Sequence, residues 1–122
     1  VDPPCIIVAV AMYGLACPAL YDAYHHFEAV VPTGATVEAN IVGPVCESGD
    51  TFAMARTCDA VAAGDLAVFR TAGAYGATMA NTYNSRALVP EVMVDGDKWC
   101  LVAERIDPAT ILAAEHVPDF LE

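Results

Sequence analysis

Basic residues are scarce in this chain of 122 residues, where five Lys and Arg stand against 16 Asp and Glu. The formal charge of −11 repels phosphate backbones, so the composition argues against nucleic-acid binding. No Lys or Arg precedes Arg56, so the apolar run over residues 5–20 lacks the basic flank of a signal peptide. That run is also too short to span a membrane and contains Pro18. We therefore expect a cytoplasmic protein that binds neither nucleic acid nor membrane.

Cysteine pairs at metal-binding spacing are also missing. The cysteines are odd in number and form no Cys-x-x-Cys motif, which argues against zinc. His25 and His26 are adjacent and cannot share one helix face, so no metal site is predicted. Cys46 is expected to be the most accessible thiol, and the other cysteines to be reduced and mostly buried. The five cysteines are Cys5, Cys17, Cys46, Cys58 and Cys100.

The chain has no low-complexity linker and no internal repeat. Its length and its hydrophobic content of 57% are enough for one buried core without disulfide or metal staples. We therefore predict a single domain over residues 1–122. The sequence starts without Met, and we expect it to be an excised or engineered fragment.

Short apolar runs between turn residues predict strands at residues 6–12, 27–31, 37–42 and 65–70. Asp95-Gly96 is the strongest hairpin signal and predicts pairing of residues 91–94 with 99–105. Asp107-Pro108 predicts the start of a short C-terminal helix. A short helical or irregular piece is expected at residues 19–25 and a helical turn at residues 51–56. These elements predict an all-β fold, a small Greek-key β-barrel or sandwich with a short C-terminal helix.

One segment combines a thiol and a carboxylate between glycines, at the end of an apolar run. It reads Gly43-Pro44-Val45-Cys46-Glu47-Ser48-Gly49-Asp50. Such a segment builds a core poorly, but it presents two titratable groups well at a functional site. The alternative is a loop thiol beside a solvated acid.

Three further segments carry polar groups in a suggestive setting. Glycines flank Tyr75 in Gly73-Ala74-Tyr75-Gly76 and allow the backbone to approach a ligand closely, although a tyrosine in a barrel turn would look the same. Tyr21 lies within residues 18–25, where a half-buried tyrosine with a bonded hydroxyl is the alternative. Tyr83-Asn84-Ser85-Arg86 contains one of the few basic residues, which could simply pair with acidic neighbours.

Taken together, these segments resemble the C-terminal β-domain of diaminopimelate decarboxylase, a pyridoxal-phosphate enzyme of lysine biosynthesis. The resemblance runs from about Val8 to the C-terminus. It implies that Cys46 protonates the carbanion left after decarboxylation, a task that suits a thiol with a tunable pKa. It also implies that Glu47 pairs with the distal amino group of the substrate, that Tyr21 contacts a substrate carboxylate, and that Tyr75 contacts the cofactor.

The chain departs from the family pattern just before Pro18. An aspartate, an asparagine, an aspartate and an arginine of the family are replaced by Ala9, Tyr13, Gly14 and Cys17. The lost arginine is the family's carboxylate clamp, whose bidentate fork a cysteine cannot replace. The replacements make the surface that would face the missing domain more apolar, so we expect association with a second copy. Such a selective loss of polar groups also suits deliberate redesign.

Pyridoxal phosphate requires a lysine and a backbone nest for its phosphate. The one lysine, Lys98, lies beside the Asp95-Gly96 turn, where it is expected to be exposed, and no glycine-rich phosphate loop precedes a helix. The resemblance places the Schiff-base lysine in a barrel domain that this chain lacks. It therefore implies pyridoxal phosphate in the parent enzyme and none in the isolated chain, with Arg86 as support at the site.

Three functions remain open at this point. The chain can complete a decarboxylase active site at a dimer interface, together with the lysine-bearing barrel and a second copy of itself. It can be an engineered stand-alone β-barrel scaffold without a ligand. It can also be a non-catalytic domain that binds an amino acid or a polyamine through Glu47.

Overall fold

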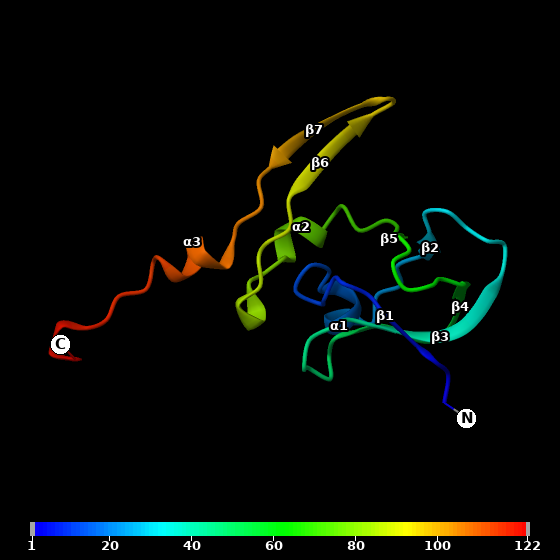
Figure 1. The fold of residues 1–122 in the computed structure, drawn as a ribbon, viewed down its shortest axis with the longest axis horizontal. Helices are drawn as coiled ribbons and strands as arrows, with labels where there is room; N and C mark the ends of the chain where they lie inside the picture. Colours follow the sequence, from blue (N-terminus) through cyan, green and yellow to red (C-terminus); the bar gives the residue numbers. More distant parts are fainter. Residues whose placement is uncertain (1, 122) are drawn as a thin grey trace. The chain divides into compact units, whose positions relative to one another are not determined.

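The computed structural model describes residues 2–121, which form two compact units; the first ends at Ala80 and the second begins at Asn81. The first unit contains β1 (Cys5–Ile7), α1 (Cys17–Tyr21), β2 (Phe27–Ala29), β3 (Thr36–Val42), β4 (Thr51–Asp59), β5 (Ala67–Phe69) and α2 (Gly76–Met79) (Figure 1). The second contains β6 (Glu91–Asp95), β7 (Lys98–Ala103), α3 (Pro108–Leu112) and two 3-10 turns (Tyr83–Ser85, Asp119–Leu121). One domain over residues 1–122 stays a prediction, because two compact units can belong to one domain.

The predicted all-β class is confirmed, since strands carry the fold and the helices are short. Among residues 2–121 the strands form three small sheets and no closed barrel. The largest sheet has the order β1-β3-β4, with β1 parallel and β4 antiparallel to β3. The second sheet pairs β2 with β5, and the third pairs β6 with β7.

The first strand is shorter than the seven residues expected. Its last ladder pair joins Ile7 to Val42, where β3 ends. One more bond follows, from the Val8 N–H to the Val42 carbonyl at 2.9 Å. Beyond it the chain has no strand to pair with, so the apolar residues 9–12 leave the sheet. Of residues 6–12, Ala11 alone is buried, whereas Ile7 and Ala9 are exposed, so the expected buried strand is wrong in burial as well as in length.

The helical turn expected at residues 51–56 is wrong, because this segment is the first part of β4. Pairing with β3 buries Phe52 and Ala53 against the core, which outweighs the local preference for a turn after Gly49. The strand is irregular at Ala55, whose φ is +44°. There the Asn40 side-chain oxygen accepts the Ala55 N–H at 2.8 Å. A β-bulge of this kind is a long-range feature that local sequence does not announce.

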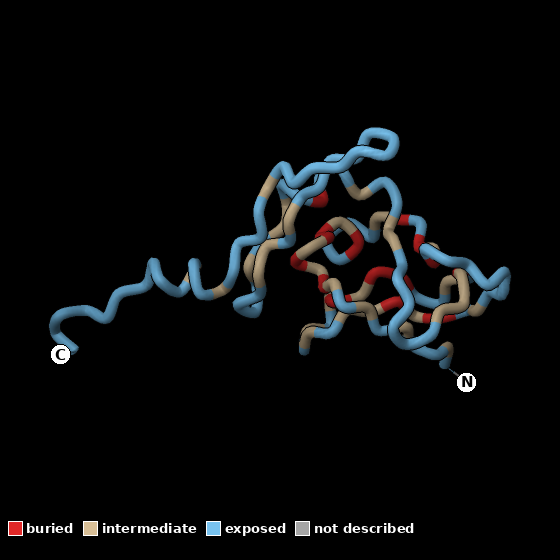
Figure 2. The backbone as a smooth tube through the Cα atoms, turned by 45° about the horizontal axis from the view of Figure 1, so that its top comes forward, coloured by how far each residue is buried: buried red, intermediate tan, exposed pale blue. Residues whose placement is uncertain are grey.

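Aromatic side chains join the two sheets of the first unit. The Phe69 ring from β5 lies 5.3 Å from Phe27 of β2 and 4.7 Å from Phe52 of β4, measured between ring centroids. Ile41 and Phe27 are the largest fully buried side chains, and Leu15 completes the cluster from the loop before α1. Buried residues gather in this unit (Figure 2).

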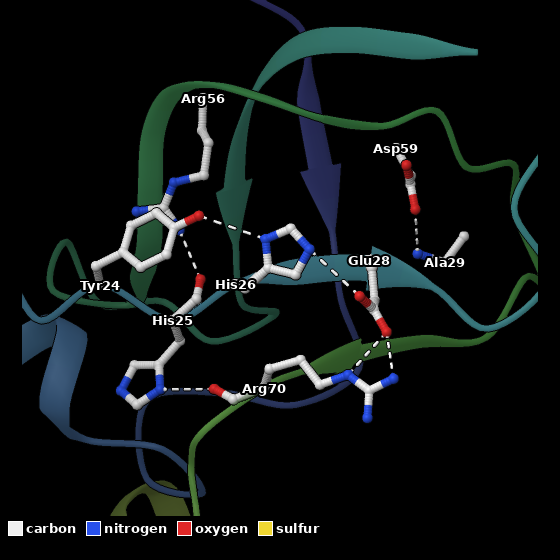
Figure 3. Close-up of polar contacts among 8 residues, drawn as sticks. All are labelled: Tyr24, His25, His26, Glu28, Ala29, Arg56, Asp59 and Arg70. Carbon is white, nitrogen blue, oxygen red and sulfur yellow. Dashed lines mark hydrogen bonds and ion pairs between the residues drawn. The ribbon is translucent and has the colours of Figure 1, made fainter. Parts of the chain in front are cut away.

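A polar network covers the ends of β2, β4 and β5 (Figure 3). Glu28 accepts a hydrogen bond from Arg70 Nε at 2.7 Å, contacts Arg70 Nη2, and lies 3.2 Å from His26 Nε2. The Arg56 guanidinium stacks over the Tyr24 ring at 4.4 Å. Arg70 thus ties the end of β5 to β2, and Arg56 ties β4 to the segment before β2.

The second unit contains the predicted hairpin. β6 and β7 are joined through Gly96, whose φ of +62° suits the tight two-residue turn. The cross-strand pairs Val92–Leu101 and Val94–Trp99 place four apolar side chains on one face, and all four are exposed. Residues 81–121 include no buried residue. An isolated hairpin without a packed face is only marginally stable in water.

The short helix expected after Asp107 is confirmed as α3, with Pro108 in its first turn. Within residues 2–121, no helix combines the length and the apolar character needed to cross a membrane.

One thiol of the core gives the first unit a pH-dependent stability. Burial raises the pKa of Cys58, and the neighbouring Asp59 carboxylate adds to this rise while Arg56 opposes it. The folded state then holds the thiol proton more tightly than the unfolded state does. The stability that comes from this preference is complete below the usual thiol pKa of about 9 and is lost as the pH rises above it.

We therefore expect the free energy of unfolding of the native chain to fall relative to that of the Cys58→Ala variant between pH 8 and about pH 11. Urea unfolding of both chains across this range measures the difference. The Cys46→Ala chain, which loses an exposed thiol, is the control. If the difference in free energy of unfolding between the native chain and Cys58→Ala did not change across this pH range, the burial of this thiol would be contradicted.

Candidate functional site

The Cys46–Glu47 segment lies in the loop over residues 43–50, which connects β3 to β4. Cys46 is exposed and Glu47 is half-buried. The Glu47 carboxylate folds back on its own loop, where Oε1 accepts the Gly49 N–H at 3.0 Å and the Ser48 hydroxyl at 3.4 Å. The thiol is therefore open to an incoming reactant, and the carboxylate beside it is held in a defined place.

Asp50 closes this loop from its buried side. The side chain is 3% exposed, and its two oxygens accept the backbone N–H groups of Met12 at 2.8 Å and Val45 at 2.9 Å. Sequence reasoning missed this residue as a member of the site. The available signal was its place at the end of the motif that begins at Gly43.

Residues 11–16 form a turn that contacts two of the sequence-predicted segments. Met12 meets the Cys46 loop through Asp50, and its Sδ lies 3.5 Å from the position of a methyl group built on Gly49. Leu15 Cδ1 lies 4.0 Å from the position of a methyl group built on Gly76. The same turn leads into α1. Residues 11–16 therefore contact the Cys46 loop and the Gly73–Gly76 segment, and they lead directly into α1, which ends at Tyr21.

Both candidate tyrosines of the first unit are open to solvent. Tyr21 ends α1 and is 69% exposed, and Tyr75 precedes α2 and is 64% exposed. Next to Tyr75, Gly76 is buried and packs near Leu15. The half-buried alternative for Tyr21 is therefore excluded, and both phenols are available to a ligand.

The third polar segment belongs to the second unit. Asn84 and Ser85 adopt left-handed backbone conformations with φ of +58° and +53°. The Tyr83 N–H donates to the Asn81 side chain at 3.0 Å, which stabilises the turn that precedes Arg86. The role of Arg86 as support at the site stays a prediction.

The replaced positions before Pro18 do not form one exposed patch. Tyr13 is 5% exposed and belongs to the interior, contrary to the expectation that it adds to an apolar surface. A methyl group at Gly14 would lie 2.9 Å from Val10 Cγ2, so this turn is closely packed. Ala9 is exposed and Cys17 is half-buried at the start of α1.

The expectation that the cysteines other than Cys46 are mostly buried is wrong. Cys5 and Cys100 are exposed as well, Cys17 is half-buried, and Cys58 alone is buried. Cys5 lies on the edge strand β1 and Cys100 on a hairpin without a buried face, which explains their exposure. Exposure therefore does not distinguish Cys46 from Cys5 and Cys100. What distinguishes Cys46 is its place in a loop, next to the Glu47 carboxylate.

The residues of this chain do not fit pyridoxal phosphate on their own. Lys98, the one lysine, is exposed at the start of β7. The one short helix that follows a glycine-rich segment, α2, has four residues. No group of three His, Cys, Asp or Glu side chains that could hold a metal ion occurs among the described residues. The described residues of the candidate site are an exposed thiol, a half-buried carboxylate and two exposed phenols.

Comparisons with known proteins identify the family of this sheet domain. A family model described as pyridoxal-dependent decarboxylase, C-terminal sheet domain, matches residues 2–73. The chain belongs to this family. A diaminopimelate decarboxylase from Zymomonas mobilis subsp. mobilis is 50% identical over 116 residues, which cover 95% of this chain and 28% of that protein. As a decarboxylase sheet domain, the chain thus spans less than a third of this relative.

Solved structures give the same assignment for the sheet domain. A diaminopimelate decarboxylase from M. jannaschii in complex with L-lysine matches 97% of this chain and 27% of its own, with a TM-score of 0.89 and 33% identity. The Helicobacter pylori enzyme in complex with L-lysine matches 92% of this chain and 30% of its own, with a TM-score of 0.82 and 29% identity. Both relatives contain much more chain than the sheet domain.

Proposed function

We propose that this domain completes the active site of a cytoplasmic, pyridoxal-phosphate-dependent diaminopimelate decarboxylase, at the interface of a dimer. In this proposal Cys46 is the proton donor, Glu47 and Tyr21 bind the substrate, and Tyr75 contacts the cofactor. A lysine-bearing barrel outside this chain holds the cofactor, so the isolated chain is inactive. The observation that carries the proposal is the loop that presents an exposed thiol beside a held carboxylate.

The chemistry of the four side chains suits this substrate class. Diaminopimelate loses one carboxylate as carbon dioxide and becomes L-lysine, the molecule named in two relatives' complexes. A proton must then reach the carbon atom that lost the carboxylate, and an exposed thiol can supply it. The Glu47 carboxylate can pair with the distal ammonium group that lysine and diaminopimelate share. Tyr21 can donate its hydroxyl hydrogen to a substrate carboxylate.

Two features support partners outside the chain. The chain covers 28% of the Zymomonas mobilis relative, so the rest of that enzyme has no counterpart here. The exposed apolar face of the β6–β7 hairpin needs a covering surface, which the barrel or a second copy would provide.

The isolated chain should not bind pyridoxal phosphate at one cofactor per chain. Lys98 is the one lysine that could hold the cofactor as an imine, and it lies exposed on a hairpin. Titration of the chain with pyridoxal phosphate should give no saturable absorbance change, and Lys98→Ala should leave the spectrum unchanged. Saturable one-to-one binding that disappears in Lys98→Ala would contradict the proposed dependence on a separate barrel.

The function itself is tested in a chimera that joins the rest of the Zymomonas mobilis relative to this chain. The assay is release of carbon dioxide from diaminopimelate, with the relative's barrel alone as the control. We expect the chimera to exceed the barrel alone. Equal rates in the two proteins would show that this domain does not complete the site.

A further inference from the structure

We propose that Asp50 is a positioning residue that fixes the Cys46–Glu47 loop against the turn leading to Tyr21. This inference rests on the proposed function, in which the thiol and the phenol act on one substrate. Asp50 itself is buried and contacts neither substrate nor cofactor in this proposal.

The side chain of Asp50 joins two segments that are remote in sequence. Oδ1 accepts the N–H of Met12, which is 38 residues away, and Oδ2 accepts the N–H of Val45, next to Cys46. Hydrogen bonds from backbone N–H groups to a carboxylate are among the stronger ones in proteins. One carboxyl group therefore holds both segments at a fixed separation.

The backbone of Asp50 closes the same loop twice more. The Gly43 N–H donates to the Asp50 carbonyl at 2.8 Å, and the Asp50 N–H donates to the Glu47 carbonyl at 3.0 Å. Cys46 and Glu47 thus lie between fixed points at both ends of the loop. A loop held in this way restricts the position of the Cys46 thiol, although the thiol itself is exposed.

Gly43 makes room for this arrangement. A methyl group at position 43 would lie 2.1 Å from Asp50 Oδ1 and 2.2 Å from Oδ2, far closer than atoms can approach. The glycine at the start of the motif is therefore required by the aspartate at its end. Gly49 has no such clash, since the nearest atoms to its added methyl group are 3.5 Å away.

Hydrogen exchange of single amides tests the contacts without any substrate. In the native chain the Met12 and Val45 amides should be protected. In Asp50→Asn one acceptor oxygen becomes a donor, so exchange of at least one of these amides should rise by about 10- to 150-fold, the factor for loss of one charge-assisted hydrogen bond. Asp59→Asn is the matched control, because Asp59 also accepts one backbone N–H, from Ala29 at 2.9 Å.

The positioning role is tested in the chimera by a double-mutant cycle. Asp50→Asn should lower kcat by about 100-fold through misplacement of the thiol, whereas Asp59→Asn should not. Because Asp50 acts through Cys46, the loss should nearly vanish when Cys46 is already alanine. A merely stabilising residue would give equal losses in both backgrounds.

The outcomes separate this inference from the proposed function. Unprotected Met12 and Val45 amides in the native chain, or an Asp50→Asn loss that adds fully to that of Cys46→Ala, would overturn the positioning role. If the Met12 and Val45 amides are protected as expected but the Cys46→Ala chimera keeps full activity, the role of the thiol is overturned and the contacts of Asp50 stand. If Asp50→Asn does not fold, Gly43→Ala, which displaces the Asp50 carboxylate, takes its place in the double-mutant cycle with Cys46→Ala. Exchange of the Met12 and Val45 amides in the native chain still tests whether Asp50 holds them.

Discussion

Replacing Cys46 by alanine in the chimera should lower kcat for diaminopimelate by about 10²- to 10⁴-fold. This is the range for loss of a positioned proton donor. The substrate contacts of Glu47 and Tyr21 remain in this variant, so KM should change much less than kcat. Steady-state kinetics of both chimeras at saturating substrate measure the effect.

Cys5→Ala and Cys100→Ala are matched controls, since both thiols are exposed, like Cys46, but lie on β1 and β7. Neither change should alter kcat appreciably. If all three alanine variants retained the activity of the parent chimera, the thiol would not be the proton donor.

Replacing Cys17 by arginine in the chimera should raise kcat/KM by about 30- to 5,000-fold. The resemblance to diaminopimelate decarboxylases implies an arginine at this position, and one desolvated, charge-assisted pair contributes about 2–5 kcal/mol. At 1.36 kcal/mol for each factor of ten, that range gives the expected gain. An arginine in the first turn of α1 opposes the helix dipole, but this costs at most about 1 kcal/mol, so the gain should prevail.

Cys17→Lys is the informative comparison, because lysine restores the charge without the bidentate fork. It should recover a smaller part of kcat/KM than arginine does. A chimera with the native Cys17 that already matched the activity of the Zymomonas mobilis enzyme would contradict the role of this position as a carboxylate clamp.

The parts of the fold that depend on neighbouring residues were predictable from the sequence. The hairpin of β6 and β7 follows from a turn signal between two apolar runs, and α3 begins at the expected Asp107-Pro108 pair. β3 was predicted within one residue of its observed start at Thr36. In each case the information lies within about ten residues.

The parts that depend on distant pairing were not predictable in the same way. β4 was mistaken for a helical turn, because its register is set by β3 and by the Asn40–Ala55 bond across a bulge. β1 stops where its partner ends at Val42. Strand length is thus decided by the neighbour as much as by the strand itself.

The candidate site shows the same division. The motif around Cys46 was visible in the sequence, and so were both tyrosines. Asp50 was overlooked, because its partner Met12 lies 38 residues away and a backbone N–H leaves no trace in the sequence. The buried position of Tyr13 was also missed, since an aromatic residue before a glycine can lie on the surface or in the core.

The most direct test is to alkylate Cys46 while decarboxylase activity is followed. The protein is the Cys17→Arg chimera with Cys5 and Cys100 replaced by alanine, which leaves Cys46 as the exposed thiol within the described part of this domain. Iodoacetamide is added, and mass mapping gives the modified fraction of Cys46 at each time. We predict that activity falls in proportion to that fraction and that saturating diaminopimelate slows both. Full activity in protein whose Cys46 is completely modified would contradict the account.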